Sequence, residues 1–123
     1  MENRFTAEPV TAGNIVMDTV RFGEGGTPLV VLPGMTMRNA FASPGALAMS
    51  YKAFREDFSV TVIGRRYDLP DGYDIRQMAE DTVQVIRALG IEQCMIFGIS
   101  QGGMMAQVMA LEDWVEWYRE VYL

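Results

Sequence analysis

The motif Gly98-Ile99-Ser100-Gln101-Gly102 constrains this chain more than any other stretch of it. An apolar run at 94–97 comes directly before the motif, and a stretch with helical periodicity follows it. Both glycines are expected where a side chain would collide with a neighbouring strand or helix. The motif therefore predicts a tight strand-to-helix turn that presents the Ser100 hydroxyl at the carboxyl end of a strand. The alternative is a structural glycine turn without a chemical role.

The composition is typical of a globular protein with one domain. The chain has 123 residues, of which 50% are hydrophobic and 21% are charged, enough for a core of its own. Its net charge of −6 and the lack of a basic stretch argue against nucleic acid as a partner. No apolar run approaches the ~18 residues of a membrane span, and the first residues lack the apolar core of a signal peptide. We therefore expect a cytoplasmic protein that binds neither nucleic acid nor a membrane.

Apolar runs and helical stripes alternate along the chain. Strands are expected at 5–10, 15–22, 29–32, 58–64 and 94–99, and helices at 44–56, 75–89 and 104–123. We expect Asp74 to cap the second helix and Gly90 to end it. This order predicts the α/β class, with three layers and a mostly parallel sheet of about five strands that carries helices on both faces.

The single domain, 1–123, divides into three parts by the same patterns. These are an N-terminal hairpin at 1–28, an α/β core with the serine turn at 29–103, and a long C-terminal helix at 104–123. That helix is rich in large aromatic side chains. They either cover the sheet or form a contact surface, and the core interpretation is favoured because helical aromatic stripes usually pack inward.

Residues 16–111 resemble the amino-terminal half of the α/β-hydrolase fold. Three segments carry the resemblance: 29–35 looks like a strand and oxyanion loop with Pro33 in place of a histidine, 73–91 is similar to the helix before the nucleophile elbow, and 97–106 looks like the elbow itself. The resemblance implies a serine-hydrolase lineage that acts on a small ester, thioester or amide substrate. It implies Ser100 as the nucleophile and the backbone N–H groups of Met35 and Gln101 as the oxyanion hole. It implies no cofactor and no metal ion.

The sequence contains no histidine. Members of the family carry the acid and the histidine after the elbow, whereas only 20 residues follow Gly103 here, and their pattern is helical. A serine hydroxyl without an adjacent base is a poor nucleophile. Whether the chain is an enzyme is therefore open, and we expect it to be inactive as given.

Two alternatives to an active hydrolase follow. The chain is a non-catalytic, truncated or engineered scaffold that self-associates as a homodimer or a larger assembly, or it is one half of a two-chain hydrolase. Self-association is expected because the strand at 94–99 would be an apolar sheet edge with unpaired backbone groups.

Other reactive or charged residues have less specific interpretations. Lys52 is the only lysine, and nothing in the sequence places it near Ser100 as a substitute base. The only cysteine, Cys94, falls in an apolar strand and is interpreted as a buried, inert thiol rather than a nucleophile.

The loop at 65–74 combines arginines with aspartates. Asp68, Asp71 and Asp74 suggest a metal site in principle, but solvated loop and cap residues explain them better. Arg65 and Arg66 could bind an anionic substrate group, although pairing with these aspartates is the favoured interpretation.

Overall fold

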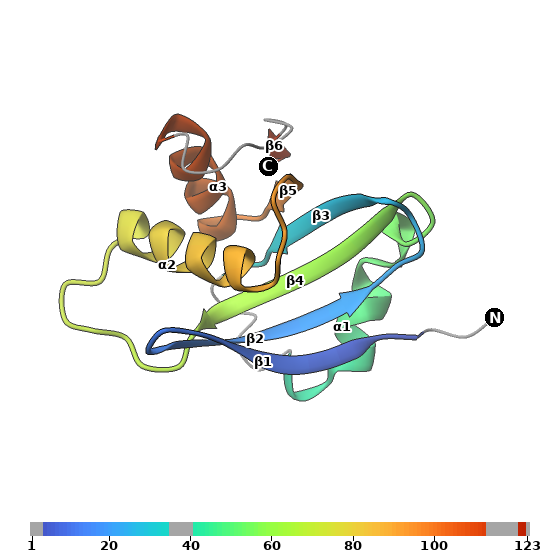
Figure 1. The fold of residues 1–123 in the computed structure, drawn as a ribbon, viewed down its shortest axis with the longest axis horizontal. Coiled ribbons are helices and arrows are strands. Elements are labelled where there is room, and N and C mark those ends of the chain that lie inside the picture. Colours follow the sequence, from blue (N-terminus) through green and yellow to red (C-terminus); the bar gives the residue numbers. More distant parts are fainter. Residues whose placement is uncertain (1–3, 35–40, 113–120, 123) are drawn as a thin grey trace.

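The computed structural model describes residues 4–34, 41–112 and 121–122 of the chain. Within these ranges six strands form one sheet in the order β1-β2-β4-β3-β5-β6 (Figure 1). The strands are β1 (Thr6–Ala12), β2 (Ile15–Phe22), β3 (Thr27–Leu32), β4 (Phe58–Arg66), β5 (Met95–Gly98) and β6 (Val121–Tyr122). The helices are α1 (Pro44–Ser50), the short 3₁₀ helix η2 (Lys52–Phe54), α2 (Ile75–Ala88) and α3 (Gln101–Glu112).

The sheet is mixed, and its antiparallel part is the N-terminal end of the chain. β1 pairs antiparallel with β2, from Thr6 opposite Arg21 to Ala12 opposite Ile15, and β2 pairs antiparallel with β4. The pairings of β4 with β3, β3 with β5 and β5 with β6 are parallel. The predicted α/β class, with a parallel region built from strand–helix–strand units, is confirmed.

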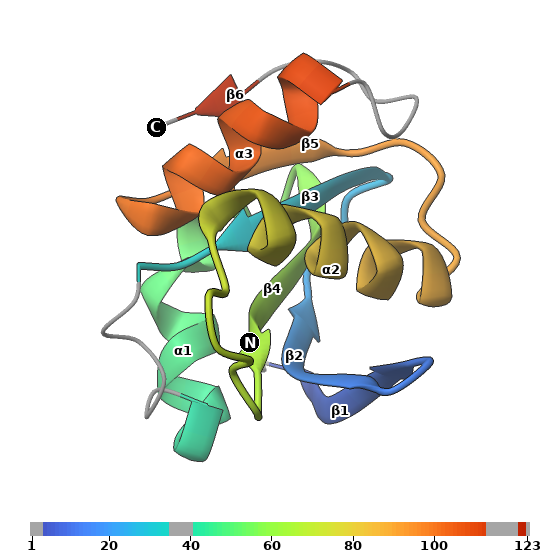
Figure 2. The ribbon, with the colours of Figure 1, turned by 90° about the vertical axis from the view of Figure 1, so that its left-hand side faces the viewer.

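Helices cover both faces of the sheet (Figure 2). On one face α2 and α3 bury Val30, Leu32, Ile63 and Ile96. On the other face Leu29, Val31, Val60 and Val62 pack with Leu47 and Ala48 of α1. Successive residues of β3 thus enter opposite cores, which explains why this strand is an unbroken apolar run.

The helix α2 begins and ends as its sequence predicts. The Asp74 carboxylate accepts a hydrogen bond of 2.9 Å from the backbone N–H of Gln77, and the Gln77 side chain accepts one of 2.9 Å from the backbone N–H of Asp74. This capping box satisfies two N–H groups that a helix start leaves unpaired. At the other end Gly90 takes a φ of 77°, which a glycine adopts without strain.

Two predicted helices are wrong in their extent. The first, expected at 44–56, ends at Ser50 and continues only as the 3₁₀ turn η2. The second, expected at 104–123, ends at Glu112, and Val121–Tyr122 forms a strand beside Ile96 and Phe97 of β5. Residues 113–120 lie outside the described ranges.

The error at the C-terminal end has a physical cause. Side-chain spacing reports which positions share a face, but it does not report where backbone N–H and C=O groups find partners. The outer side of β5 offers such partners, and β6 takes them at two positions. The expectation that β5 is an open edge of the sheet is therefore wrong at Ile96 and Phe97.

No helix in the described ranges is both long enough and apolar enough to span a membrane.

Candidate active site at the Ser100 turn

Ser100 has the backbone geometry that its motif predicts. Its φ is 55°, and it is the one non-glycine residue with a positive φ in the described part of the chain. A side chain in this region of the backbone map is strained, and such strain is kept where the surrounding structure enforces it. The turn joins the end of β5 to the start of α3 and leaves Ser100 exposed.

The two motif glycines are required by close backbone contacts. A Cβ atom on Gly98 would lie 2.5 Å from the carbonyl oxygen of Gly102. A Cβ atom on Gly102 would lie 2.0 Å from the carbonyl oxygen of Leu32, the last residue of β3. Both distances are far below van der Waals contact, so the motif spacing is a packing requirement of this turn.

Backbone hydrogen bonds hold the turn against the end of β3. The N–H of Ile99 donates to the carbonyl of Leu32 at 3.0 Å, and the N–H of Gly102 donates to the carbonyl of Ile99 at 2.9 Å. The first bond of the helix follows, from the N–H of Met104 to the carbonyl of Ser100 at 3.2 Å. Ser100 thus stands at the N-terminus of α3, where helix N–H groups carry partial positive charge.

The loop that leaves β3 lies next to Ser100. A Cβ atom on Gly34 would be 3.7 Å from the Cβ atom of Ser100 and 3.7 Å from the carbonyl oxygen of Ile99. Gln101 is the first residue of α3. Met35, the other expected oxyanion donor, lies outside the described residues, so its role stays a prediction, as do the catalytic roles of Ser100 and Gln101.

Arg65 reaches this site from β4, which the sequence analysis did not anticipate. Its Nε donates a hydrogen bond of 3.0 Å to Oε1 of Gln101, and its Nη2 donates one of 2.7 Å to the carbonyl oxygen of Pro33. Burial lowers the pKa of the Arg65 guanidinium. The expectation that Arg65 pairs with the loop aspartates is wrong. One feature of the sequence could have indicated that Arg65 lies at the site. Arg65 stands at the carboxyl end of a predicted strand, and ligand sites of open α/β sheets lie at that edge.

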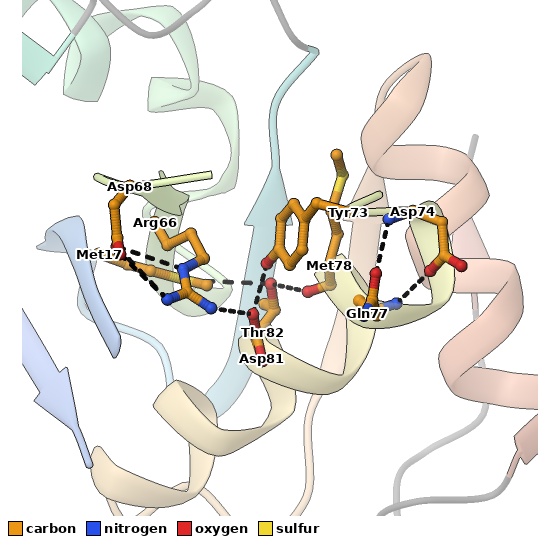
Figure 3. Close-up of polar contacts among 9 residues, drawn as sticks. All are labelled: Met17, Arg66, Asp68, Tyr73, Asp74, Gln77, Met78, Asp81 and Thr82. Atoms are coloured by element: carbon orange, nitrogen blue, oxygen red, sulfur yellow. Dashed lines mark hydrogen bonds and ion pairs between the residues drawn. The ribbon is translucent and has the colours of Figure 1, made fainter. Parts of the chain in front are cut away.

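The neighbouring Arg66 does pair with aspartates, one in the loop and one on α2 (Figure 3). Its Nη1 donates to Asp81 on α2 at 3.1 Å, and its guanidinium lies 3.4 Å from Asp68. The hydroxyl of Tyr73 donates to the same carboxylate oxygen of Asp81. Burial and this hydrogen bond raise the pKa of Tyr73. These contacts connect the 67–74 loop to α2, and the residues that make them, Arg66, Asp68, Tyr73 and Asp81, are called the tether below.

The acidic residues of this loop do not form a metal site. Asp74 caps α2, Asp68 pairs with Arg66, and Asp71 is exposed. In the described ranges no three Asp, Glu, Cys or His side chains come together as a ligand set.

Lys52 and Cys94 lie away from Ser100. Lys52 is exposed in η2, close to Arg55, whose carbonyl accepts a hydrogen bond from Glu24 in the turn before β3. It therefore lies at the amino end of the parallel strands, opposite the serine. Cys94 is buried, and burial raises the pKa of its thiol to about 12. The interpretation of Cys94 as a buried thiol is confirmed.

Comparison with known proteins identifies the fold. No family model and no curated protein matches the sequence. Among solved structures, the epoxide hydrolase CorEH is 27% identical with a TM-score of 0.66, over 93% of this chain and 40% of that one. A protein from Nostoc sp. PCC 7120 described as an α/β hydrolase is 24% identical with a TM-score of 0.75, over 91% of this chain and 40% of that one.

A third match is an N-formylmaleamic acid deformylase from Pseudomonas putida. It is 19% identical with a TM-score of 0.70, over 89% of this chain and 43% of that one. The chain thus spans about two fifths of the length of these proteins. The described part of the chain has the α/β-hydrolase fold.

Proposed function

We propose that Ser100 is the nucleophile of a serine-hydrolase site that acts on small esters, thioesters or amides. The observation that carries this proposal is the φ of 55° at an exposed serine on a strand-to-helix turn. Strained residues of this kind cluster at functional sites. The likeness to α/β hydrolases supports a hydrolase-type scaffold, and an acyl group on Ser100 is the intermediate expected of it.

The backbone N–H of Gln101 is proposed as one donor to the oxyanion. It belongs to the first residue of α3, directly after Ser100. The N–H of Met35 is proposed as the second, because Met35 directly follows Gly34, which lies next to Ser100. Each donor of this kind contributes roughly 10²–10³ in rate.

The base that activates Ser100 is proposed to come from outside these 123 residues, because they include no histidine. In a serine protease, loss of the base costs on the order of 10⁶ in turnover and leaves about 10³–10⁴ over water. These residues alone are therefore expected to react slowly at Ser100. A second chain is one possible source of the base, which keeps the two-chain hydrolase as a proposal.

The test is labelling by a fluorophosphonate probe, with p-nitrophenyl acetate hydrolysis measured in parallel. Ser100→Ala is the decisive variant. Ser50→Ala is the matched control, since Ser50 is exposed on α1 and its hydroxyl donates to the carbonyl of Ala46 at 3.1 Å. We expect slow labelling of the parent chain and of Ser50→Ala, mapped to Ser100, and none of Ser100→Ala. Equal labelling of all three proteins would contradict the proposal.

Self-association is a second proposed property, and a different observation favours it. Met104 is 49% exposed and Leu111 is 84% exposed on α3. They lie seven residues apart and so share one helix face. An apolar face of this kind is proposed to contact a second copy of the chain.

A further inference from the structure

One side chain joins the ends of three neighbouring strands at the Ser100 site. Arg65 belongs to β4, Pro33 directly follows β3, and Gln101 begins the helix that follows β5. β3 lies between β4 and β5 in the sheet. Through its bonds to Pro33 and Gln101, the Arg65 guanidinium on β4 connects to the segments that follow β3 and β5. We infer that Arg65 is a positioning residue, which fixes the two backbone segments that carry the proposed oxyanion donors; this inference rests on the proposed function of Ser100.

The first bond acts on the loop after β3. The carbonyl of Pro33 accepts from Nη2 of Arg65 at 2.7 Å. This carbonyl belongs to the rigid peptide unit between Pro33 and Gly34. The next peptide unit carries the N–H of Met35, the proposed donor. When the Pro33–Gly34 peptide unit is held in place, only the φ and ψ angles of Gly34 can change the orientation of the following peptide unit. Gly34 itself packs near Ser100.

The second bond acts on the start of α3. Oε1 of Gln101 accepts from Nε of Arg65 at 3.0 Å. The backbone N–H of the same residue is the other proposed donor. Because a guanidinium is planar, its donors keep a fixed spacing, and the two acceptors are held at a fixed separation. A flexible side chain that ends in a single donor group, such as lysine, could not fix the separation of the two acceptors.

The charge of Arg65 also suits this place. In the described part of the chain no carboxylate forms an ion pair with Arg65. The positive charge is therefore not cancelled by an adjacent acid in that part of the chain. A fixed cation near a developing oxyanion lowers the energy of the transition state.

The test compares Arg65→Met, Arg65→Lys and Gln101→Met with Arg66→Met. Arg66→Met is the matched control because it makes the same substitution at the next residue. The partners of Arg66 are Asp68 and Asp81 rather than groups at the Ser100 turn. Saturation kinetics of Ser100 acylation by a p-nitrophenyl ester separate the limiting rate from the half-saturating concentration. Urea unfolding of each variant measures stability on the same samples.

We expect Arg65→Met to lower the limiting acylation rate roughly tenfold to a hundredfold, with the half-saturating concentration within about twofold. Arg65→Lys keeps the charge but cannot span both acceptors, so it should recover only part of the rate. Arg66→Met should change stability and leave the limiting rate unchanged. A fall in the limiting rate that follows the loss of stability to the same degree in Arg65→Met and Arg66→Met would overturn the inference.

A second measurement keeps this inference separate from the proposed function. If acylation does not depend on Ser100, the proposed function fails, and the geometry is then read from ¹H–¹⁵N spectra. We expect Arg65→Met to shift the backbone amide resonances of Gly34 and Gln101, and Arg66→Met to leave both in place. Unchanged resonances in Arg65→Met would overturn the positioning role regardless of activity.

Discussion

Arg66 at the end of β4 and Asp81 on α2 are joined by a hydrogen bond of 3.1 Å, although they lie fifteen residues apart in the chain. The Arg66 side chain is 10% exposed and that of Asp81 is 17% exposed. The Tyr73 hydroxyl donates to the same carboxylate, and the guanidinium carbon lies 5.6 Å from the centre of the Tyr73 ring. One residue of a strand and one of a loop thus depend on a single acid of a helix.

Replacement of that acid tests the tether. In Asp81→Ala, Arg66 and Tyr73 both lose a partner in a poorly hydrated place, which costs more than the loss of an exposed ion pair. Asp68→Ala is the control, because the Asp68 side chain is 79% exposed. We expect a clearly larger fall in the urea midpoint for Asp81→Ala than for Asp68→Ala. Equal midpoints would contradict the tether.

Cys94 predicts a pH dependence of stability. Its pKa is raised to about 12 by burial, so the folded thiol stays protonated where an unfolded thiol, with a pKa of about 8.5, ionises. The stabilisation is therefore complete below about pH 8.5 and is lost as the pH rises towards 12. Between pH 9 and 10 the parent chain should lose up to about 1.4 kcal/mol per pH unit more than Cys94→Ala. Parallel pH curves from urea unfolding would contradict this.

The glycines at the turn predict a sharp contrast in tolerance. Gly102→Ala would place a Cβ atom 2.0 Å from a backbone oxygen of Leu32, which no side-chain movement relieves. We expect it to lower the free energy of unfolding by about 3 kcal/mol or more, or to prevent folding. Gly34→Ala is the control, because its nearest new contacts are at 3.7 Å. Circular dichroism with urea titration measures both, and a mild effect at Gly102 would show that the turn can relax.

The apolar face of α3 predicts a concentration-dependent mass. Leu111→Glu should shift sedimentation velocity profiles towards the monomer, because it adds a charge to an 84% exposed apolar position. Gln107→Glu is the matched control: it adds the same charge at another exposed position of α3. A parent chain that is monomeric throughout the micromolar range would contradict self-association through this face.

Local patterns were sufficient for most elements because they reflect local physics. Asp74 and Gln77 form their capping box within one turn of helix, and Gly90 ends that helix through its own backbone freedom. The Gly98 and Gly102 spacing predicted the turn at Ser100. The helix at 104–123 was mispredicted because the partner of Val121 and Tyr122, β5, lies more than twenty residues earlier in the sequence.

The sequence by itself determined the α/β class, the strained serine turn and the lack of an imidazole in these residues. Each of these depends on residue identity or on spacing within a single element. Only the tertiary structure decided that Arg65 bonds to Pro33 and Gln101 while Arg66 bonds to Asp81. Two adjacent arginines at the end of one strand carry the same local signal, and the helices that hold their partners, α3 and α2, cover the same face of the sheet. Their different partners lie 15 to 36 residues away in the sequence, and only folding brings them together.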